Sequence, residues 1–112
     1  GIIVCDSMTF DELKVILDET GLKVGYRLWA VGQAPPLPYI LYYVDEEIGF
    51  KADNQIYAKN KDITIELYSN LKNEREEQKL EKLLDDNKIV YEIYESYLDS
   101  EKMYLRAYEI NI

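Results

Sequence analysis

The chain reads Leu37-Pro-Tyr-Ile-Leu-Tyr-Tyr-Val-Asp45, then Ala52-Asp-Asn-Gln-Ile-Tyr57, and then Asp62-Ile-Thr-Ile-Glu-Leu-Tyr-Ser69. Runs of branched aliphatic and aromatic residues of this length are typical of β-strands, and polar residues separate them. The first run is continuously apolar after its proline, which predicts a central strand. In the third run isoleucine and leucine alternate with polar residues, so one face of that strand should be buried and the other wet.

A first helix is predicted before these runs, over residues 10–20. Thr9 and Glu12 have the spacing of a capping box, in which each side chain accepts a hydrogen bond from the backbone of the other residue. Apolar residues then recur on one helical face. Gly21 can end the helix because glycine readily adopts a left-handed conformation.

A second helix is predicted after the runs, over residues 74–86. Asn73 is a suitable N-cap, and the glutamates of the first turn suit the positive end of the helix dipole. Three leucines supply a buried stripe, and Asn87 is expected to end the helix in a left-handed conformation. The charged residues of this helix are expected to form a solvated face.

Further strands are predicted over residues 24–31, 89–97 and 102–112, with a turn over residues 98–101. Residues 60–62 mark a bulge or bend, so the second and third opening runs count as one strand. The order is therefore helix, three strands, helix, two strands. Short connections favour antiparallel pairing. We expect an α+β fold in one domain, residues 1–112, with an antiparallel sheet of about four to five strands, a mixed sheet as the alternative, and two helices on one face.

Composition argues against catalysis. The 112 residues include no histidine and one cysteine, whereas hydrolytic, redox and metal chemistry at neutral pH commonly uses one of these residues. No nucleophile, base or phosphate-binding glycine loop is visible, so we expect no enzyme and no cofactor. The sequence therefore predicts a protein that acts through its surfaces.

Charge and tyrosine content suggest the kind of surface. The chain carries 22 acidic and 13 basic residues, a formal charge of −9, which would repel a nucleic-acid backbone. Its 11 tyrosines suit a half-buried sheet and are also common at protein interfaces. Arg27 and Trp29, two apart on a predicted strand, are expected to share one face in the core or at an interface.

The polar segment from Asp45 to Asn54 is longer than a tight hairpin requires, and such loops often carry function. Its carboxylates do not have the spacing of a calcium-binding EF-hand loop, so no metal site is predicted. We expect this segment and the strand beside it to form a contact between subunits. The candidate interface residues are Asp45, Glu46, Glu47, Phe50, Asp53, Asn54 and Tyr57.

The three opening runs, together with a charged helix ending in Leu83-Leu-Asp-Asp86 and the segment Ser100-Glu-Lys-Met-Tyr104, resemble a family of small proteins. These proteins are encoded in the tail-assembly region of siphophages and prophages of Gram-positive hosts. The resemblance covers roughly residues 37–112. The order of elements also resembles that of phage tail terminator, or tail completion, proteins.

That resemblance implies a virion structural subunit in the tail or neck, made in the host cytoplasm. Such subunits form a ring, commonly six-fold, that ends the tail tube and meets the head connector or stopper protein. The implied partners are further copies of the chain, the tail tube protein and the connector. DNA would pass through the lumen without specific binding, and no membrane is involved. Two alternatives stay open: another neck or head–tail joining protein, and a small acidic inhibitor or immunity protein that binds a basic partner.

Overall fold

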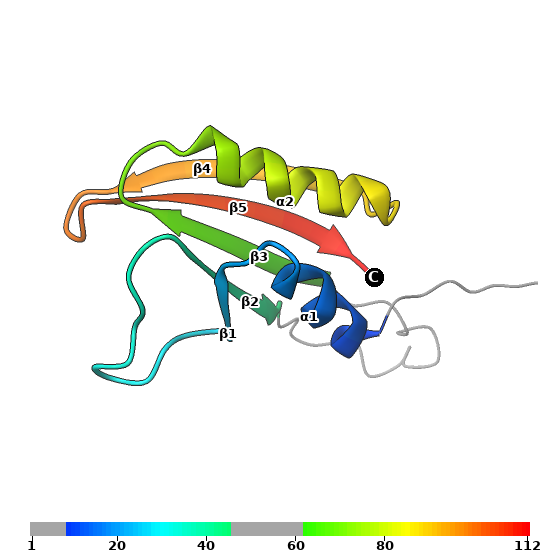
Figure 1. Cartoon of the computed structure of the whole chain (residues 1–112), viewed down its shortest axis with the longest axis horizontal. Coiled ribbons are helices and arrows are strands. Elements are labelled where there is room, and N and C mark those ends of the chain that lie inside the picture. The colour runs from blue at the N-terminus through cyan, green and yellow to red at the C-terminus, as the bar shows by residue number, and fades with distance from the viewer. Residues whose placement is uncertain (1–8, 46–61) are drawn as a thin grey trace, which may run out of the picture.

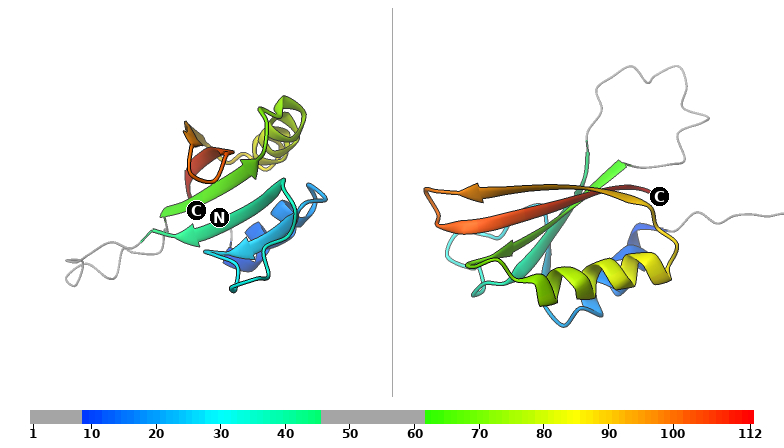
Figure 2. Two further views of the ribbon diagram at one scale, coloured as in Figure 1. Left: turned by 90° about the vertical axis from the view of Figure 1, so that its left-hand side faces the viewer. Right: turned by 90° about the horizontal axis from the view of Figure 1, so that it is seen from above.

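The structure, a computed structural model, describes residues 9–45 and 62–112 and contains two helices and one five-stranded mixed sheet (Figure 1). The strands lie in the order β1-β2-β3-β5-β4. The elements are α1 (Phe10–Asp18), β1 (Lys23–Tyr26), β2 (Tyr39–Val44), β3 (Asp62–Ser69), α2 (Glu74–Asp86), β4 (Tyr91–Leu98) and β5 (Met103–Asn111). The predicted α+β class is confirmed, and Figure 2 shows both helices on the same side of the sheet.

Helix α1 begins where the capping box predicts. The backbone N–H of Thr9 donates to the Glu12 carboxylate at 2.9 Å, and the N–H of Glu12 donates to the Thr9 hydroxyl at 3.1 Å. The helix ends at Asp18, two residues earlier than predicted. From Glu19 to Gly21 each backbone N–H donates to the carbonyl three residues earlier, as in a turn, instead of four residues earlier, as in an α-helix. Gly21 does adopt the left-handed conformation, with φ of 84°.

Helix α2 has the predicted bounds, but the reason for its end differs. Asn87 has φ of −97°, which is not left-handed, and its side-chain amide donates to the Leu83 carbonyl at 2.8 Å. Lys88 is the left-handed residue, with φ of 59°. Asn87 therefore caps the last turn with its side chain instead of its backbone. No helix in the described part of the chain is long and apolar enough to cross a membrane.

Strand β1 differs most from prediction. It covers Lys23–Tyr26, ends before the predicted residue 31, and pairs with β2 in parallel. Arg27 breaks the strand with φ of 67°, and its N–H donates to the Tyr42 carbonyl at 2.9 Å. Residues 27–38 then return the chain to the end of the sheet where β2 starts, and parallel neighbours need a connection of roughly this length. The other strand pairs are antiparallel, as predicted.

The core lies between the helices and one face of the sheet. Along β3, Ile63, Ile65 and Leu67 are buried on that face, as predicted, but the other face is not the wet one expected, because Thr64 is buried there and Glu66 and Tyr68 are half-buried. Burial of each of the three aliphatic side chains contributes roughly 1.5–3 kcal/mol. Strand β2 is interior to the sheet, as its apolar run predicts. The other buried members of the core are Leu13, Ile16, Leu17, Ile40, Tyr42, Leu80, Leu84, Ile89, Tyr108 and Ile110.

Candidate subunit interface

Of the predicted interface residues, Asp45 alone lies in the described part of the chain. It directly follows β2, where its N–H donates to the Asp62 carbonyl at 2.8 Å and its carboxylate accepts from the Thr64 hydroxyl at 2.9 Å. The predicted loop therefore leaves the sheet from a fixed, half-buried position. The remaining predicted residues, Glu46, Glu47, Phe50, Asp53, Asn54 and Tyr57, lie outside the described residues.

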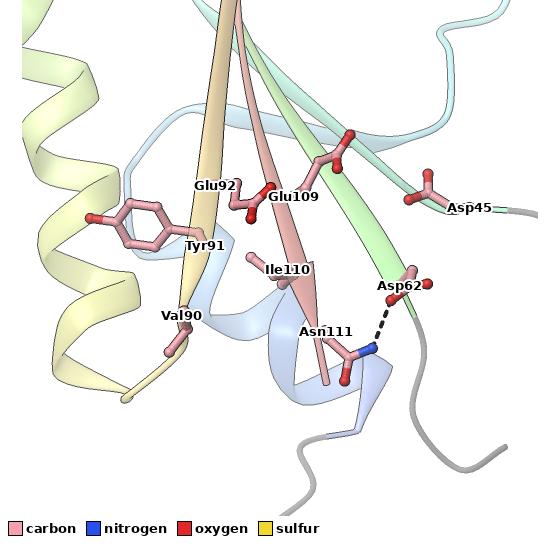
Figure 3. Close-up of a pocket in the computed structure, with 8 residues that line it drawn as sticks. All are labelled: Asp45, Asp62, Val90, Tyr91, Glu92, Glu109, Ile110 and Asn111. Atoms are coloured by element: carbon pink, nitrogen blue, oxygen red, sulfur yellow. Dashed lines mark hydrogen bonds between the residues drawn. The ribbon is translucent and has the colours of Figure 1, made fainter. Parts of the chain in front are cut away.

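Acidic side chains gather at the end of the sheet where Asp45 lies. Asp45, Asp62, Glu92 and Glu109 line a hollow of about 410 Å³, and the Asn111 amide donates to Asp62 at 2.7 Å (Figure 3). Glu92 and Glu109 stand directly opposite each other on β4 and β5, a pairing of like charges that disfavours the isolated sheet. Within residues 9–45 and 62–112, no group of three or more potential metal ligands is arranged to hold an ion. In the described part of the chain, this end of the sheet is an acidic surface.

The face of the sheet away from the helices carries a carboxylate held by two phenols. Tyr43 and Tyr68 donate to the two oxygens of Glu66 at 3.0 Å and 2.7 Å. Burial, followed by the neighbouring Glu66 carboxylate, raises the pKa of both tyrosines, so both hydroxyls remain donors. The guanidinium of Arg27 lies 5.0 Å from the centre of the Tyr43 ring, within the range of a cation–π contact.

Trp29 covers the β1 end of the same face. Its ring meets Tyr39 edge-on with 5.4 Å between centroids, and it lies directly over Gly25, where a Cβ would be 2.7 Å from the indole. Arg27 and Trp29 do not form the shared strand face that was predicted, because the strand ends at Tyr26 and the two side chains contact different tyrosines. Both still act in packing.

Strand β4 is an exposed edge of the sheet. Every residue from Glu92 to Tyr97 is exposed, including the apolar and aromatic side chains of Ile93, Tyr94 and Tyr97. The strand contains no lysine, arginine or proline, and its eight residues pair with β5 in unbroken register. Natural edge strands are usually protected by such residues, by bulges or by short length. Glu92 and Glu95 are the charged residues of β4, and the exposed Ile93, Tyr94 and Tyr97 between and beside them leave a long edge with apolar surface that another chain could contact.

On the helix side, an ion network ties α2 to the sheet. Arg106 of β5 contacts Glu81 at 3.0 Å and Glu95 at 3.2 Å, and Tyr108 donates to Glu81 at 2.7 Å. Glu77 is 6% exposed and binds Lys72 at 3.0 Å. The prediction that the charged residues of α2 are simply solvated is therefore wrong for Glu77 and Glu81, which hold the helix on the sheet.

The sequence analysis missed β4 as a candidate interface. The signal was present in Tyr91-Glu-Ile-Tyr-Glu-Ser-Tyr-Leu98, where apolar side chains are found at both odd and even positions. A strand buried on one face alternates, whereas this one places aromatic residues on both faces. The absence of lysine, arginine and proline was a second sign.

Comparison of the chain with protein-family models, with curated proteins and with solved structures gives no match. Function therefore has to be argued from the surfaces themselves. Among the described residues, the carboxylates of Glu66, Glu81 and Glu92 each accept a hydrogen bond from a tyrosine. What the molecule offers to a partner is an acidic end, an exposed strand edge and exposed aromatic rings.

Proposed function

We propose that this chain is a phage virion structural protein, a tail terminator or tail completion subunit that caps the tail tube as a ring and joins it to the head connector. The observation that carries the proposal is the long exposed β4 edge, on which Ile93, Tyr94 and Tyr97 are all exposed. A subunit of a ring needs two different contact surfaces that complement each other, and no chemistry. The α+β architecture with both helices on one face agrees with this role.

The proposed surroundings follow from the same role. The partners are further copies of the chain, the tail tube protein and the connector or stopper protein. Rings of this kind are commonly six-fold. DNA passes through the lumen, and a formal charge of −9 disfavours its adhesion to the walls. The loop after Asp45 is proposed as a second contact with neighbouring subunits or with the tube.

Mass spectrometry of purified particles tests the proposal. Particles from an induced lysogen or an infected culture should contain this chain at the few copies of a single ring. Antibody labelling of the particles should then place it at the head-proximal end of the tail. Labelling elsewhere in the neck would favour the alternative of another head–tail joining protein, and absence of the chain from intact particles would refute both structural roles.

The acidic end favours a second candidate function. The carboxylates of Asp45, Asp62, Glu92 and Glu109 surround one hollow and could receive a basic side chain of a partner protein. An inhibitor or immunity protein that masks a basic partner would use such a surface. Affinity purification from infected cells at low and high salt distinguishes the two. A single basic partner that is lost steeply as salt rises would support the inhibitor role.

A further inference from the structure

The sheet has two outer strands, β1 and β4, that lie at opposite edges (Figure 2). Within the described residues, no strand pairs with the outer side of either. At each edge, backbone N–H and C=O groups that face outwards are available to another chain. The described part of the molecule therefore offers two edges for contact. Whether β1 of one copy can pair with β4 of another depends on their charges and on the directions of the two strands.

The two edges carry opposite charge. Lys23 and Arg27 lie at the ends of β1 and are exposed, and this segment has no acidic residue. Glu92 lies on β4, which has no basic residue, whereas Glu95 of the same strand is already paired with Lys72 and Arg106. Opposite charges across a pair of strands stabilise the pair, and like charges destabilise it. Charge therefore favours contact between β1 and β4 over contact between two copies of β4.

The directions of the strands are also compatible. Strand β1 is parallel to β2, β2 is antiparallel to β3, β3 is antiparallel to β5, and β5 is antiparallel to β4. Hence β1 and β4 run in opposite directions. If a second copy is placed beside the first with the same orientation, its β1 lies antiparallel to the first copy's β4.

We propose that the free edge of β4 pairs in antiparallel fashion with the free edge of β1 of a second copy of this chain. If Val24 lies opposite Ile93, the helix-covered faces of the two sheets form one continuous face, because both side chains are on the helix side of their strands. Tyr26 then meets Tyr91, and Lys23 lies one diagonal step from Glu92. Aromatic pairs and opposite charges at these separations each stabilise a sheet.

The contact is heterologous, because each copy uses one edge to bind and the other to be bound. Repetition of such a contact produces a ring when the rotation closes. The inference thus deepens the proposed tail terminator function and rests on it for the statement that the assembly is a closed ring. The pairing of β1 with β4 itself is a property of the chain and can be tested without phage particles.

Sedimentation velocity on the purified 112-residue chain tests the pairing. In buffer of about 20 mM ionic strength, where charge attraction is weakly screened, species larger than a dimer should form as concentration rises towards about 1 mM. Lys23→Glu and Glu92→Lys should each weaken association about tenfold or more, since each puts like charges at the contact. The chain with both changes should associate again, because the charges are then exchanged.

Matched controls separate this effect from net charge and from unfolding. Lys82→Glu changes net charge as Lys23→Glu does, but lies on α2 with a side chain that is 73% exposed, and it should leave association unchanged. Circular dichroism and thermal melts should show every variant to be folded. An equimolar mixture of the two single variants should also associate, since each supplies the edge charge that the other lacks.

Three outcomes would overturn the inference. They are a chain that stays monomeric at every concentration and salt, a dimer that is indifferent to Lys23→Glu, and a double variant that is no better than the single ones. Failure here is distinguishable from failure of the proposed function. A chain absent from particles that still associates through these edges refutes the phage role alone, and a chain present in particles whose association ignores both charges refutes the pairing alone.

Discussion

At the scale of single residues, the contact between Gly25 and Trp29 shows how tightly the far face of the sheet is packed. A Cβ at position 25 would lie 2.7 Å from the indole ring, so one of the two must move. Gly25→Ala should therefore lower the free energy of unfolding by about 1–2 kcal/mol, as overpacking does elsewhere. Urea denaturation measures this. The cost should fall sharply in a Trp29→Ala background, and an equal cost in both backgrounds would mean that the indole is not the cause.

Arg106 is the residue whose removal should cost most on the helix side. The Arg106 side chain is 19% exposed. Its guanidinium forms ion pairs with Glu81 and Glu95 and lies beside the nearly buried Glu77. Arg106→Met leaves these carboxylates short of a partner, and we expect a loss of about 2–3 kcal/mol in chemical denaturation. The control is Lys82→Met, which breaks an exposed ion pair with Asp86 and should cost no more than about 0.5 kcal/mol. Equal losses would show that the network is not buried enough to matter.

At the scale of elements, Glu95 links β4 to the segment before α2. Its hydrogen bond from Lys72, at 2.7 Å, is the main cause that holds the pKa of Glu95 below its usual 4.5, and Arg106 adds to it. A carboxylate with a lowered pKa stabilises the fold above its unfolded-state pKa and loses that contribution as pH falls through the folded-state value. Glu95→Gln should therefore reduce stability at neutral pH, by up to about 1 kcal/mol because the pair is partly exposed.

The pH dependence of that difference is the sharper measurement. Denaturation of wild type and Glu95→Gln from pH 7 downwards should give curves that converge below about pH 4.5. In a Lys72→Met background the gap at neutral pH should shrink. A gap that persists unchanged at pH 3 would mean that Glu95 contributes through packing and not through its charge.

Most elements could be predicted from the sequence because they depend on neighbours in the chain, and the exceptions depend on an unusual backbone conformation or on contacts distant in sequence. The capping box at Thr9 and the alternation after Asp62 depend on neighbours in the chain, so their spacing predicts α1 and β3. The parallel pairing of β1 with β2 depends on Arg27, whose left-handed backbone ends the strand early and makes room for a long return. No residue pattern predicts a left-handed arginine. The burial of Glu77 likewise depends on Lys72 and Arg106, and the sequence does not show that Arg106 lies beside the helix.

At the scale of the whole molecule, the candidate site was harder to predict than the fold. The segment after Asp45 was predicted as a contact because long loops often carry function; its residues after Asp45 lie outside the described part of the chain, so this stays a prediction, and the described part adds an exposed edge strand. An edge is a property of the strand order β1-β2-β3-β5-β4, in which the last two strands are exchanged. Sequence order alone would place β5 at the edge and β4 beside β3. The composition of Tyr91–Leu98 can be read from the sequence, but its position at the edge of the sheet follows only from the topology.

The charge of the whole chain leads to the last prediction, which concerns DNA. With a formal charge of −9 and carboxylates around one end of the sheet, the chain should not bind duplex DNA even at about 20 mM salt, where electrostatic attraction would be strongest. Electrophoretic mobility shift and fluorescence anisotropy with labelled duplex measure this. Exchange of Glu92 and Glu109 for lysine turns this acidic pair into a basic one and reduces the repulsion of DNA, so any DNA binding should appear first in that variant, at low salt. Binding by the wild-type chain at physiological salt would contradict a lumen through which DNA slides without adhesion.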